Sequence, residues 1–230
     1  MPTTDPGANP EPPRDCPLCP RLVGYRDENR AAHPDWWNGP APSFGDPSAR
    51  LLVVGLAPGR TGANRTGRPF TGDHAGVLLY QTLIKAGFAK GTYDARPDDG
   101  LALVDCMITN AVRCAPPGNK PETAEEAACR PFLAARITAL PRLKVIVTLG
   151  DVARRSVLRA LGLKASAGAG GHGARYEAAG YSLINSYHCS RLNTNTGRLT
   201  PAMFEAVFEA VKAELGDPLS AVTPGGAQGA

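Results

Sequence analysis

The sequence predicts a three-layer α/β/α fold around a central, mostly parallel sheet of four strands. Short continuous apolar runs alternate with stretches of helical periodicity, which is the order expected of a parallel sheet covered on both faces. The runs occupy residues 51–54, 101–104 continuing towards 108, 145–149 and 182–185. With 230 residues, 43% of them hydrophobic, the chain can build one sizeable core, so we expect a single domain over residues 16–216.

The helices that would cover this sheet have recognisable start signals. In chain order these are the N-cap Asp73, the pair Thr123 and Glu126 with capping-box spacing, the residue Asp151, and Thr200 followed by Pro201. Cap side chains accept hydrogen bonds from the first free N–H groups of a helix, and proline is tolerated at the first helical position. We therefore expect a helix after each of the four.

The two ends of the chain differ from the core in composition. Residues 1–15 and 217–230 are rich in Pro, Gly and Ala, with too little apolar surface to offset the entropy of ordering, and are expected to be disordered tails. No stretch approaches the roughly 20 apolar residues that span a bilayer, and the start lacks the features of a signal peptide. We expect a soluble, cytoplasmic monomer with no membrane partner.

The charge balance is compatible with a polyanionic partner. The net charge is +4, the pI is near 8.8, and Arg supplies 19 of the 25 basic residues. The planar guanidinium suits phosphate contacts better than the ammonium of Lys does. Many unrelated enzymes have a similar net charge and pI, so these two values do not identify a partner by themselves.

A glycine-rich stretch with three arginines, GLAPGRTGANRTGRPFTGD, follows the first predicted strand at residues 55–73. It is not a P-loop, because Arg68 stands where Lys is needed and Pro69 where a hydroxyl would hold magnesium. It also lacks the dinucleotide pattern G-x-G-x-x-G. Ligands of parallel sheets bind beyond the carboxyl ends of the strands, where this loop, the segment around Asn110 and the segment after Asn185 all emerge.

Four cysteines form a candidate metal site. Cys16 and Cys19 make a C-x-x-C turn, and Cys114 and Cys129 are separated by fourteen residues around a predicted helix start. Four thiolates can surround zinc or bind an iron–sulfur cluster, and their spacing leaves both open. The alternative is four small buried thiols. The remaining two, Cys106 and Cys189, are expected to be packed thiols.

Three motifs in this order, GLAPGRTGANRTGRPFTGD, ITNAVRCAPPGNKPETAEEAACRPFL and SYHCSRLNTNTGRLT, closely resemble the uracil-DNA glycosylase superfamily, specifically its iron–sulfur type-B branch (family 5). The resemblance covers nearly everything from Cys16 to Leu215. The type-A branch (family 4) typically has an acidic residue where this chain has Leu56, and relatives usually have proline where it has Cys189. The resemblance implies a structural [4Fe–4S] cluster on the four cysteines and a DNA partner containing uracil or another deaminated or damaged base.

Such an enzyme flips the base out of DNA and breaks its N-glycosidic bond, which builds positive charge on the sugar and negative charge on the base. Asp73 is the candidate to stabilise the sugar cation and position water, although it could serve only as a helix cap. Asn110 can contact the base edge or orient the water through its amide, or merely form a turn. His188 can donate to the base carbonyl, or be satisfied at its own strand end.

Further residues are candidates for holding the base and the DNA. The small residues of the loop let backbone amides approach, Phe70 offers a stacking face unless it belongs to the core, and Leu192 could fill the space left by the base. The full candidate set for base or DNA binding is Gly55, Ala57, Gly59, Arg68, Phe70, Ser190, Arg191, Leu192 and Arg198. Residues 190–198 could equally be a polar loop that leads into the next helix.

We therefore expect a monofunctional DNA repair glycosylase with water as nucleophile and a broad range of bases, such as uracil, hypoxanthine and ethenocytosine. No lysine in the three motifs is an evident candidate for a Schiff base. The alternatives are a non-catalytic iron–sulfur nucleic-acid-binding protein and a nucleotide-using redox enzyme.

Overall fold

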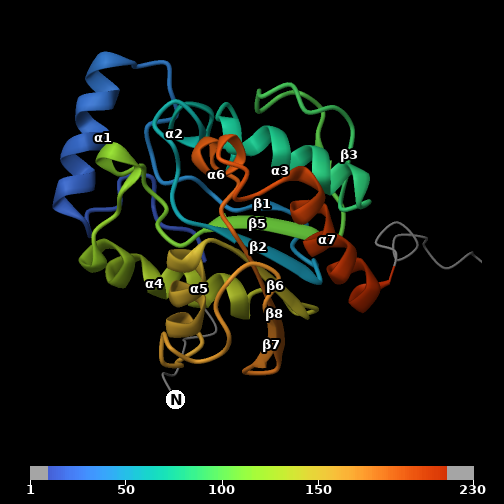
Figure 1. Cartoon of the computed structure of the whole chain (residues 1–230). Coiled ribbons are helices and arrows are strands. Elements are labelled where there is room, and N and C mark those ends of the chain that lie inside the picture. The colour runs from blue at the N-terminus through green and yellow to red at the C-terminus, as the bar shows by residue number, and fades with distance from the viewer. Residues whose placement is uncertain (1–9, 217–230) are drawn as a thin grey trace, which may run out of the picture.

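The computed structural model describes residues 10–216 and confirms the α/β/α architecture (Figure 1). The helices are α1 (Pro20–Ala32), α2 (Ala63–Thr66), α3 (His74–Lys85), α4 (Thr123–Thr138), α5 (Asp151–Ala160), α6 (Arg191–Asn195), α7 (Pro201–Leu215) and the 3-10 turn η1 (Pro117–Asn119). The strands are β1 (Phe44–Gly45), β2 (Leu51–Gly55), β3 (Ala89–Lys90), β4 (Ala102–Leu103), β5 (Cys106–Asn110), β6 (Val145–Leu149), β7 (Arg175–Ala178) and β8 (Tyr181–Ser186).

The central sheet has six strands rather than the predicted four, in the order β1-β5-β2-β6-β8-β7. The inner four are parallel and fully buried or nearly so, as their apolar runs predicted. The two additional strands pair antiparallel at the edges. They escaped prediction because β1 has two residues and β7 alternates half-buried and exposed side chains, so neither forms a continuous apolar run.

The prediction that one strand runs from 101 towards 108 is wrong in its first half. Residues 102–103 form β4, which pairs with β3 in a separate two-stranded sheet. The chain turns at Asp105, which has a left-handed φ of 50°. Its carboxylate accepts hydrogen bonds from the backbone N–H of Arg50 at 2.9 Å and from the Arg50 Nε at 2.6 Å. The central strand therefore begins only at Cys106.

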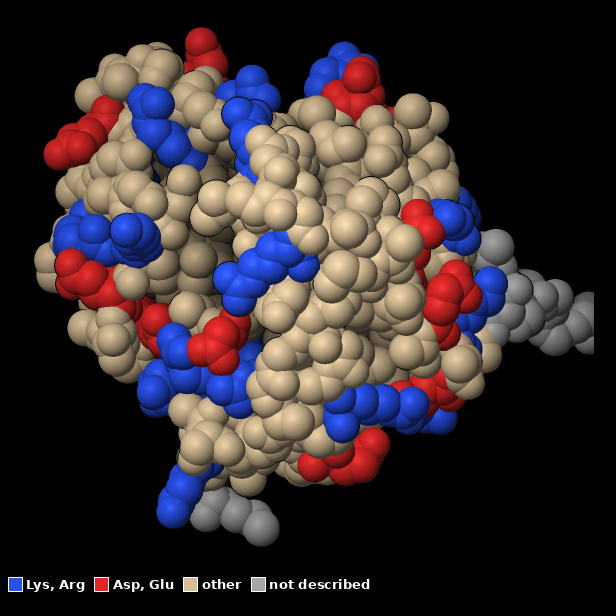
Figure 2. Space-filling model, in the orientation of Figure 1, with Lys and Arg blue, Asp and Glu red and all other residues tan. Residues whose placement is uncertain are grey.

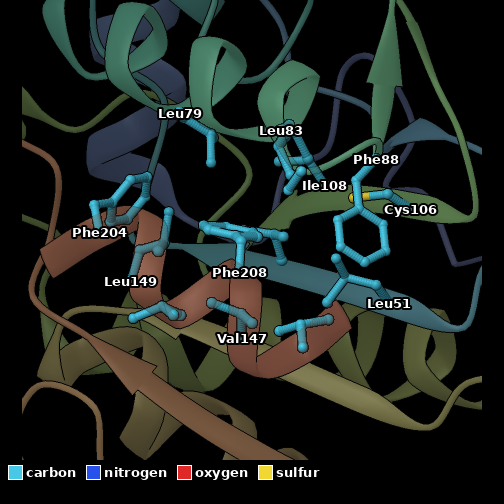
Figure 3. Packing of buried hydrophobic residues seen from close by; sticks show 14 of the residues in the cluster. Leu51, Leu79, Leu83, Phe88, Cys106, Ile108, Val147, Leu149, Phe204 and Phe208 are labelled. Carbon is cyan, nitrogen blue, oxygen red and sulfur yellow. The ribbon is translucent and has the colours of Figure 1, made fainter. Parts of the chain in front are cut away.

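Two hydrophobic cores fill the two sides of the sheet. On one side α3 and α7 pack on the strands; Figure 3 shows Leu79 and Leu83 of α3 and Phe204 and Phe208 of α7 pointing at this face of the sheet. On the other side α4 and α5 cover the strands, with Leu133 among the contacts (Figure 1). Cys106 and Cys189 are fully buried in the first core, which confirms that both are packed thiols.

Two of the predicted helix caps are confirmed. Asp73 accepts from the Gly76 N–H at 3.1 Å, and Thr200 accepts from the Met203 N–H at 3.2 Å, as predicted. The capping box of α4 is not made by Thr123 and Glu126.

The box of α4 uses Glu122 and Glu125 instead. The Glu125 carboxylate accepts from the Glu122 N–H at 2.7 Å and forms an ion pair with Arg21 at 2.8 Å. A carboxylate can accept hydrogen bonds from these N–H groups, as a hydroxyl does. The long-range ion pair with Arg21 favours Glu122 and Glu125 over the predicted pair, which lies one residue later.

The described residues include the predicted start of the domain. The predicted tails fall mainly on residues 1–9 and 217–230, which lie outside the described residues. Residues 10–15 are described, and within them the Glu11 carboxylate pairs with Arg113 and, at 2.5 Å, with Arg136. Contacts to the domain therefore start before Cys16. In the described part of the chain, no helix has the length and apolar character needed to cross a bilayer.

Candidate active site

The carboxyl ends of the parallel strands bring the three predicted segments together. Gly55 at the end of β2 is in register with Asn110 at the end of β5, and Leu149 of β6 is in register with Ser186 of β8. The glycine-rich loop, the segment after Asn110 and the segment after β8 therefore leave the sheet at one edge. The loop itself is not extended throughout, since it contains the short helix α2.

Asp73 stands at the end of this loop with its two carboxylate oxygens in different surroundings. One oxygen, Oδ1, accepts from Gly76 at the start of α3. The other, Oδ2, faces the turn at Gly59 and Gly62, where added Cβ atoms would lie 3.3 Å and 2.5 Å from it. Burial raises the pKa of the Asp73 carboxyl above its ordinary value, although backbone N–H groups oppose this shift. Asp73 thus caps the helix with one oxygen and turns the second towards the glycine turn of the loop.

Phe70 and Asn110 meet at the end of β2. A Cβ on Gly55 would lie 2.4 Å from Asn110 Oδ1 and 2.5 Å from the Phe70 ring, so glycine is required for this close approach. Phe70 is buried with a left-handed φ of 54° and belongs to the hydrophobic core beside α3, the alternative that the sequence left open for its ring. Asn110 Oδ1 is buried and has no hydrogen-bond partner among the described residues. An unpaired buried amide is rare and indicates a polar partner from outside the chain.

The backbone of Phe70 is held by two tyrosines. Tyr93 donates its hydroxyl to the Phe70 carbonyl at 3.1 Å, and Tyr80 donates to the neighbouring Pro69 carbonyl at 2.6 Å. A non-glycine residue with positive φ persists only where its surroundings fix it. The orientation of the Phe70 ring is therefore set by the fold.

His188 follows β8 and approaches the same point. Its ring centroid lies 6.2 Å from that of Phe70, with the planes tilted by 32°. Burial lowers the pKa of His188, which favours the neutral imidazole near pH 7. Its Cβ lies 3.4 Å from the position of a Cβ on Gly150, whose φ of 94° allows the tight turn at the end of β6.

Asp73 and His188 line one pocket of about 390 Å³. The other described residues around it are Leu56, Ala57, Gly59, Arg60, Thr61, His74, Ala75, Asn119, Ser190, Arg191 and Leu192. Figure 2 shows this face of the molecule hollowed between its α1 side and its α6 side, with Lys and Arg side chains on both sides of the hollow. A pocket of this size accommodates a small flat molecule such as a nucleobase.

The short helix α6 forms one rim of the pocket. Ser190 caps it by accepting from the Asn193 N–H at 3.5 Å, and Asn193 in turn donates to the His188 carbonyl at 2.8 Å. Leu192 is 72% exposed, which is unusual for a large apolar side chain beside a polar pocket. Arg198 does not line this pocket; it lines a neighbouring hollow with His188 and Asn193, and its guanidinium lies 4.6 Å from the Tyr187 ring centroid.

The interpretation of Arg68 as a DNA contact is wrong. Its guanidinium is 5% exposed and donates to both carboxylate oxygens of Asp99, at 2.8 Å and 2.7 Å, and to Thr71 at 2.7 Å. With these bonds made, the group has no face free for phosphate. Arg68 instead ties the loop to the segment around Asp99.

Sequence reasoning missed Asn119 and His74, among other residues of the pocket. Asn119 reaches it from η1 and has a left-handed φ of 57°, and His74 lies at the start of α3 with Nε2 3.1 Å from Thr194 Oγ1. The Gly-Asn pair at 118–119 is a turn signal, but only the fold reveals that the turn faces the pocket.

The four candidate metal cysteines lie together around a second, smaller hollow next to α1. All are free, and burial raises the pKa of Cys114 to about 12 and that of Cys129 to about 11, with the neighbouring thiols adding to both shifts. The Arg113 N–H donates to Cys129 Sγ at 3.3 Å. No three metal-ligating side chains within residues 10–216 form a group that would hold a single ion.

Comparison with known proteins gives one consistent result. The family model described as "Uracil DNA glycosylase superfamily" matches residues 42–212. A type-5 uracil-DNA glycosylase of Thermus thermophilus is 48% identical over 202 residues, 85% of this chain and 92% of that protein, and one of Pyrobaculum aerophilum is 42% identical over 205 residues, 87% and 89% of the two chains. A type-4 uracil-DNA glycosylase of Pyrobaculum aerophilum is 33% identical over 125 residues, 54% of this chain and 56% of that protein.

Proposed function

The chain belongs to the uracil-DNA glycosylase superfamily, and on this premise we propose that it excises uracil and other deaminated or damaged bases from DNA. The observation that carries the proposal is that one pocket is lined by a carboxylate, Asp73, and a neutral imidazole, His188, beside the Phe70 ring and the unpaired amide oxygen of Asn110. The product is an abasic site, and the strand is left intact.

The base reaches this pocket by leaving the DNA stack. Extrusion costs a few kcal/mol, which contacts in the pocket must offset. In this proposal the base stacks on Phe70, a contact worth about 1 to 3 kcal/mol. Leu192, exposed at the rim, enters the space that the base leaves in the duplex. Arg191 at the same rim supplies positive charge for the backbone.

Asp73 and His188 act on opposite charges as the N-glycosidic bond breaks. The Asp73 oxygen that faces the glycine turn stabilises the developing sugar cation and orients the attacking water. Neutral His188 donates a hydrogen bond to the base oxygen on which negative charge develops. The lowered pKa of His188 leaves the imidazole neutral near pH 7, so it acts as a donor without adding a full charge.

Asn110 holds the edge of the base. Its side chain has an acceptor and two donors at one end, and a rotation of the amide exchanges them. This supports a broad range of bases, since uracil and hypoxanthine present different edges. No lysine lines the pocket in the described residues, which supports water as the nucleophile.

Base release from DNA tests the proposal. The purified protein is incubated with a uracil-containing duplex, and abasic sites are detected by strand cleavage in alkali. We expect release from this duplex and from duplexes with hypoxanthine or ethenocytosine, and none from thymine. The Asp73→Ala, His188→Ala double variant should bind the duplex but release no base, whereas Arg142→Gln, at the opposite end of the sheet, should match the parent. Binding without release by the parent protein would favour the non-catalytic alternative.

We further propose that the four cysteines Cys16, Cys19, Cys114 and Cys129 hold a [4Fe–4S] cluster. All four thiols line one hollow, and the Arg113 N–H donates to Cys129 Sγ, as N–H groups do to the sulfurs of iron–sulfur clusters; both observations support the proposal. When bound, the cluster would fasten the start of α1 to the segments around Cys114 and Cys129.

Absorption and metal content test this assignment. Protein purified without oxygen should be brown and contain about four irons per chain. Cys114→Ser should lose the iron and melt at a lower temperature. A colourless protein with one zinc per chain would contradict the cluster.

We also propose a cytoplasmic location and action as a monomer. The six cysteines form no disulfide with one another, which suits a reducing compartment. Sedimentation with and without DNA measures the oligomeric state.

A further inference from the structure

A third hollow, the tryptophan hollow, lies beside the candidate active site and has no part in the mechanism above. It has a volume of about 560 Å³ and is lined by Trp36 and Trp37 together with Arg14, Arg65 and Arg96. These are the two tryptophans of the whole sequence. Half-buried aromatic rings among arginines are the composition of single-stranded nucleic-acid sites, where bases stack and phosphates pair with guanidinium groups.

The two rings are fixed in different ways. Trp37 is part of the framework: its Nε1 donates to the Pro40 carbonyl at 3.0 Å, and its ring packs on Gly67, where a Cβ would lie 3.0 Å from it. Trp36 stacks on His33 with centroids 3.9 Å apart and planes within 8°. A nucleobase can extend this existing two-ring stack with little loss of side-chain entropy.

Two arginines connect this hollow with the active-site pocket. Arg60 lines the pocket, and its guanidinium lies 5.4 Å from the Trp36 ring centroid. Arg65 lines the tryptophan hollow, and its Nη2 would be 2.7 Å from a Cβ on Gly72, which directly precedes Asp73. A strand whose damaged base occupies the pocket therefore passes these two guanidinium groups when it continues towards Trp36.

The charge of the hollow suits phosphates. Its lining contains three arginines and one acid, Asp35. Arg96 pairs with Asp94 at 3.2 Å, but both side chains are more than 60% exposed, so this pair is weak and exchanges readily with a phosphate.

Resting on the proposed glycosylase function, we propose that the tryptophan hollow binds an unpaired nucleotide of the damaged strand that is separated from the base in the pocket by intervening nucleotides. The nucleobase stacks on Trp36, and the intervening phosphates contact Arg65 and the remaining Nη1 of Arg60. The Nε of Arg60 already donates to Asn29 Oδ1 at 2.7 Å, and its Nη2 lies 2.9 Å from His33 Nε2. Single-stranded substrates, whose flanking bases are free, gain this contact without the unpairing that a duplex requires.

Tryptophan fluorescence reports directly on this site, because no tryptophan lies elsewhere in the chain. The probes are single-stranded oligonucleotides of about 4 and about 16 nucleotides, spanning known single-strand site sizes, each with a central tetrahydrofuran residue in place of the damaged nucleotide. We expect the long probe to quench the fluorescence strongly and the short probe to quench it little. Trp36→Phe should lose most of the quenching, and Trp37 then provides the remaining signal.

Affinity measured by a label on the DNA gives the second readout. Trp36→Ala should weaken the long probe by about 5- to 150-fold, the equivalent of one stacked base, and leave the short probe within about twofold. Arg65→Gln should weaken the long probe and reduce its salt dependence by about 0.7 in the log–log slope, whereas Arg142→Gln should do neither. Trp36→Phe retains an aromatic face and should bind nearly as the parent does.

The outcomes separate this inference from the proposed function. Quenching that is absent with the long probe, or unchanged in Trp36→Phe, overturns the subsite even where uracil is still released from a short oligonucleotide. Failure to release uracil from any DNA overturns the function itself. Thermal melting of each variant verifies that the fold is retained.

Discussion

The two oxygens of Asp73 allow its structural and chemical roles to be separated by two substitutions. Oδ1 caps α3 through Gly76, while Oδ2 faces Gly59 and Gly62 in the pocket. Asp73→Asn keeps an acceptor for the Gly76 N–H and removes the negative charge. Asp73→Ala removes both the acceptor and the charge.

The expected magnitudes differ by readout. Loss of an N-cap costs about 1 kcal/mol, which lowers the melting temperature of a domain of this size by about 2 to 4 °C. Loss of a preorganised group that stabilises transition-state charge slows the reaction by about 10²- to 10³-fold. Burial raises the pKa of Asp73, so the charged form is disfavoured in the fold, and Asp73→Asn should melt no lower than the parent near pH 7.

The assay pairs thermal melting with single-turnover release of uracil from a duplex. Both variants should lose activity to a similar extent, and only Asp73→Ala should melt at a lower temperature. Full activity in Asp73→Asn would show that the carboxylate serves only the helix start and would refute the reasoning. An unchanged melting temperature in Asp73→Ala would refute the capping energy.

Three further predictions concern the pocket. Because burial lowers the pKa of His188, kcat/KM should stay flat down to about pH 6.5 and decrease at lower pH. Below about pH 6.5 the folded state binds fewer protons than the unfolded state, so the parent should lose thermal stability more steeply than His188→Gln does. Leu192→Ala should slow release from duplex DNA by about tenfold or more and leave release from single strands nearly unchanged, since only a duplex needs the vacated space filled; equal losses on both substrates would contradict the wedge. Gly55→Ala should sharply reduce release, because its Cβ would lie 2.4 Å from Asn110 Oδ1 and 2.5 Å from the Phe70 ring, and a fully active variant with an unchanged melting curve would disprove this packing.

Much of the fold could be predicted because the relevant signals are local. An apolar run such as residues 51–54 has no low-energy alternative to burial, and the edge at which parallel strands end is fixed by their direction. The caps Asp73 and Thr200 act on N–H groups two or three residues away, so sequence spacing is enough to identify them. The capping box at Glu122 was missed by one residue, because its choice involves Arg21, about a hundred residues distant.

The candidate site shows the same division. The residue types and spacing of the three motifs determined, by themselves, which family the chain resembles and which side chains carry charge near the strand ends. Only the tertiary structure decided that the Arg68 guanidinium is paired with Asp99, that Asn119 lines the pocket, and that Trp36 lies beside Arg60. The physical reason is that a motif specifies the chemistry a side chain can offer, whereas its availability depends on partners that only the folded chain brings within hydrogen-bond distance.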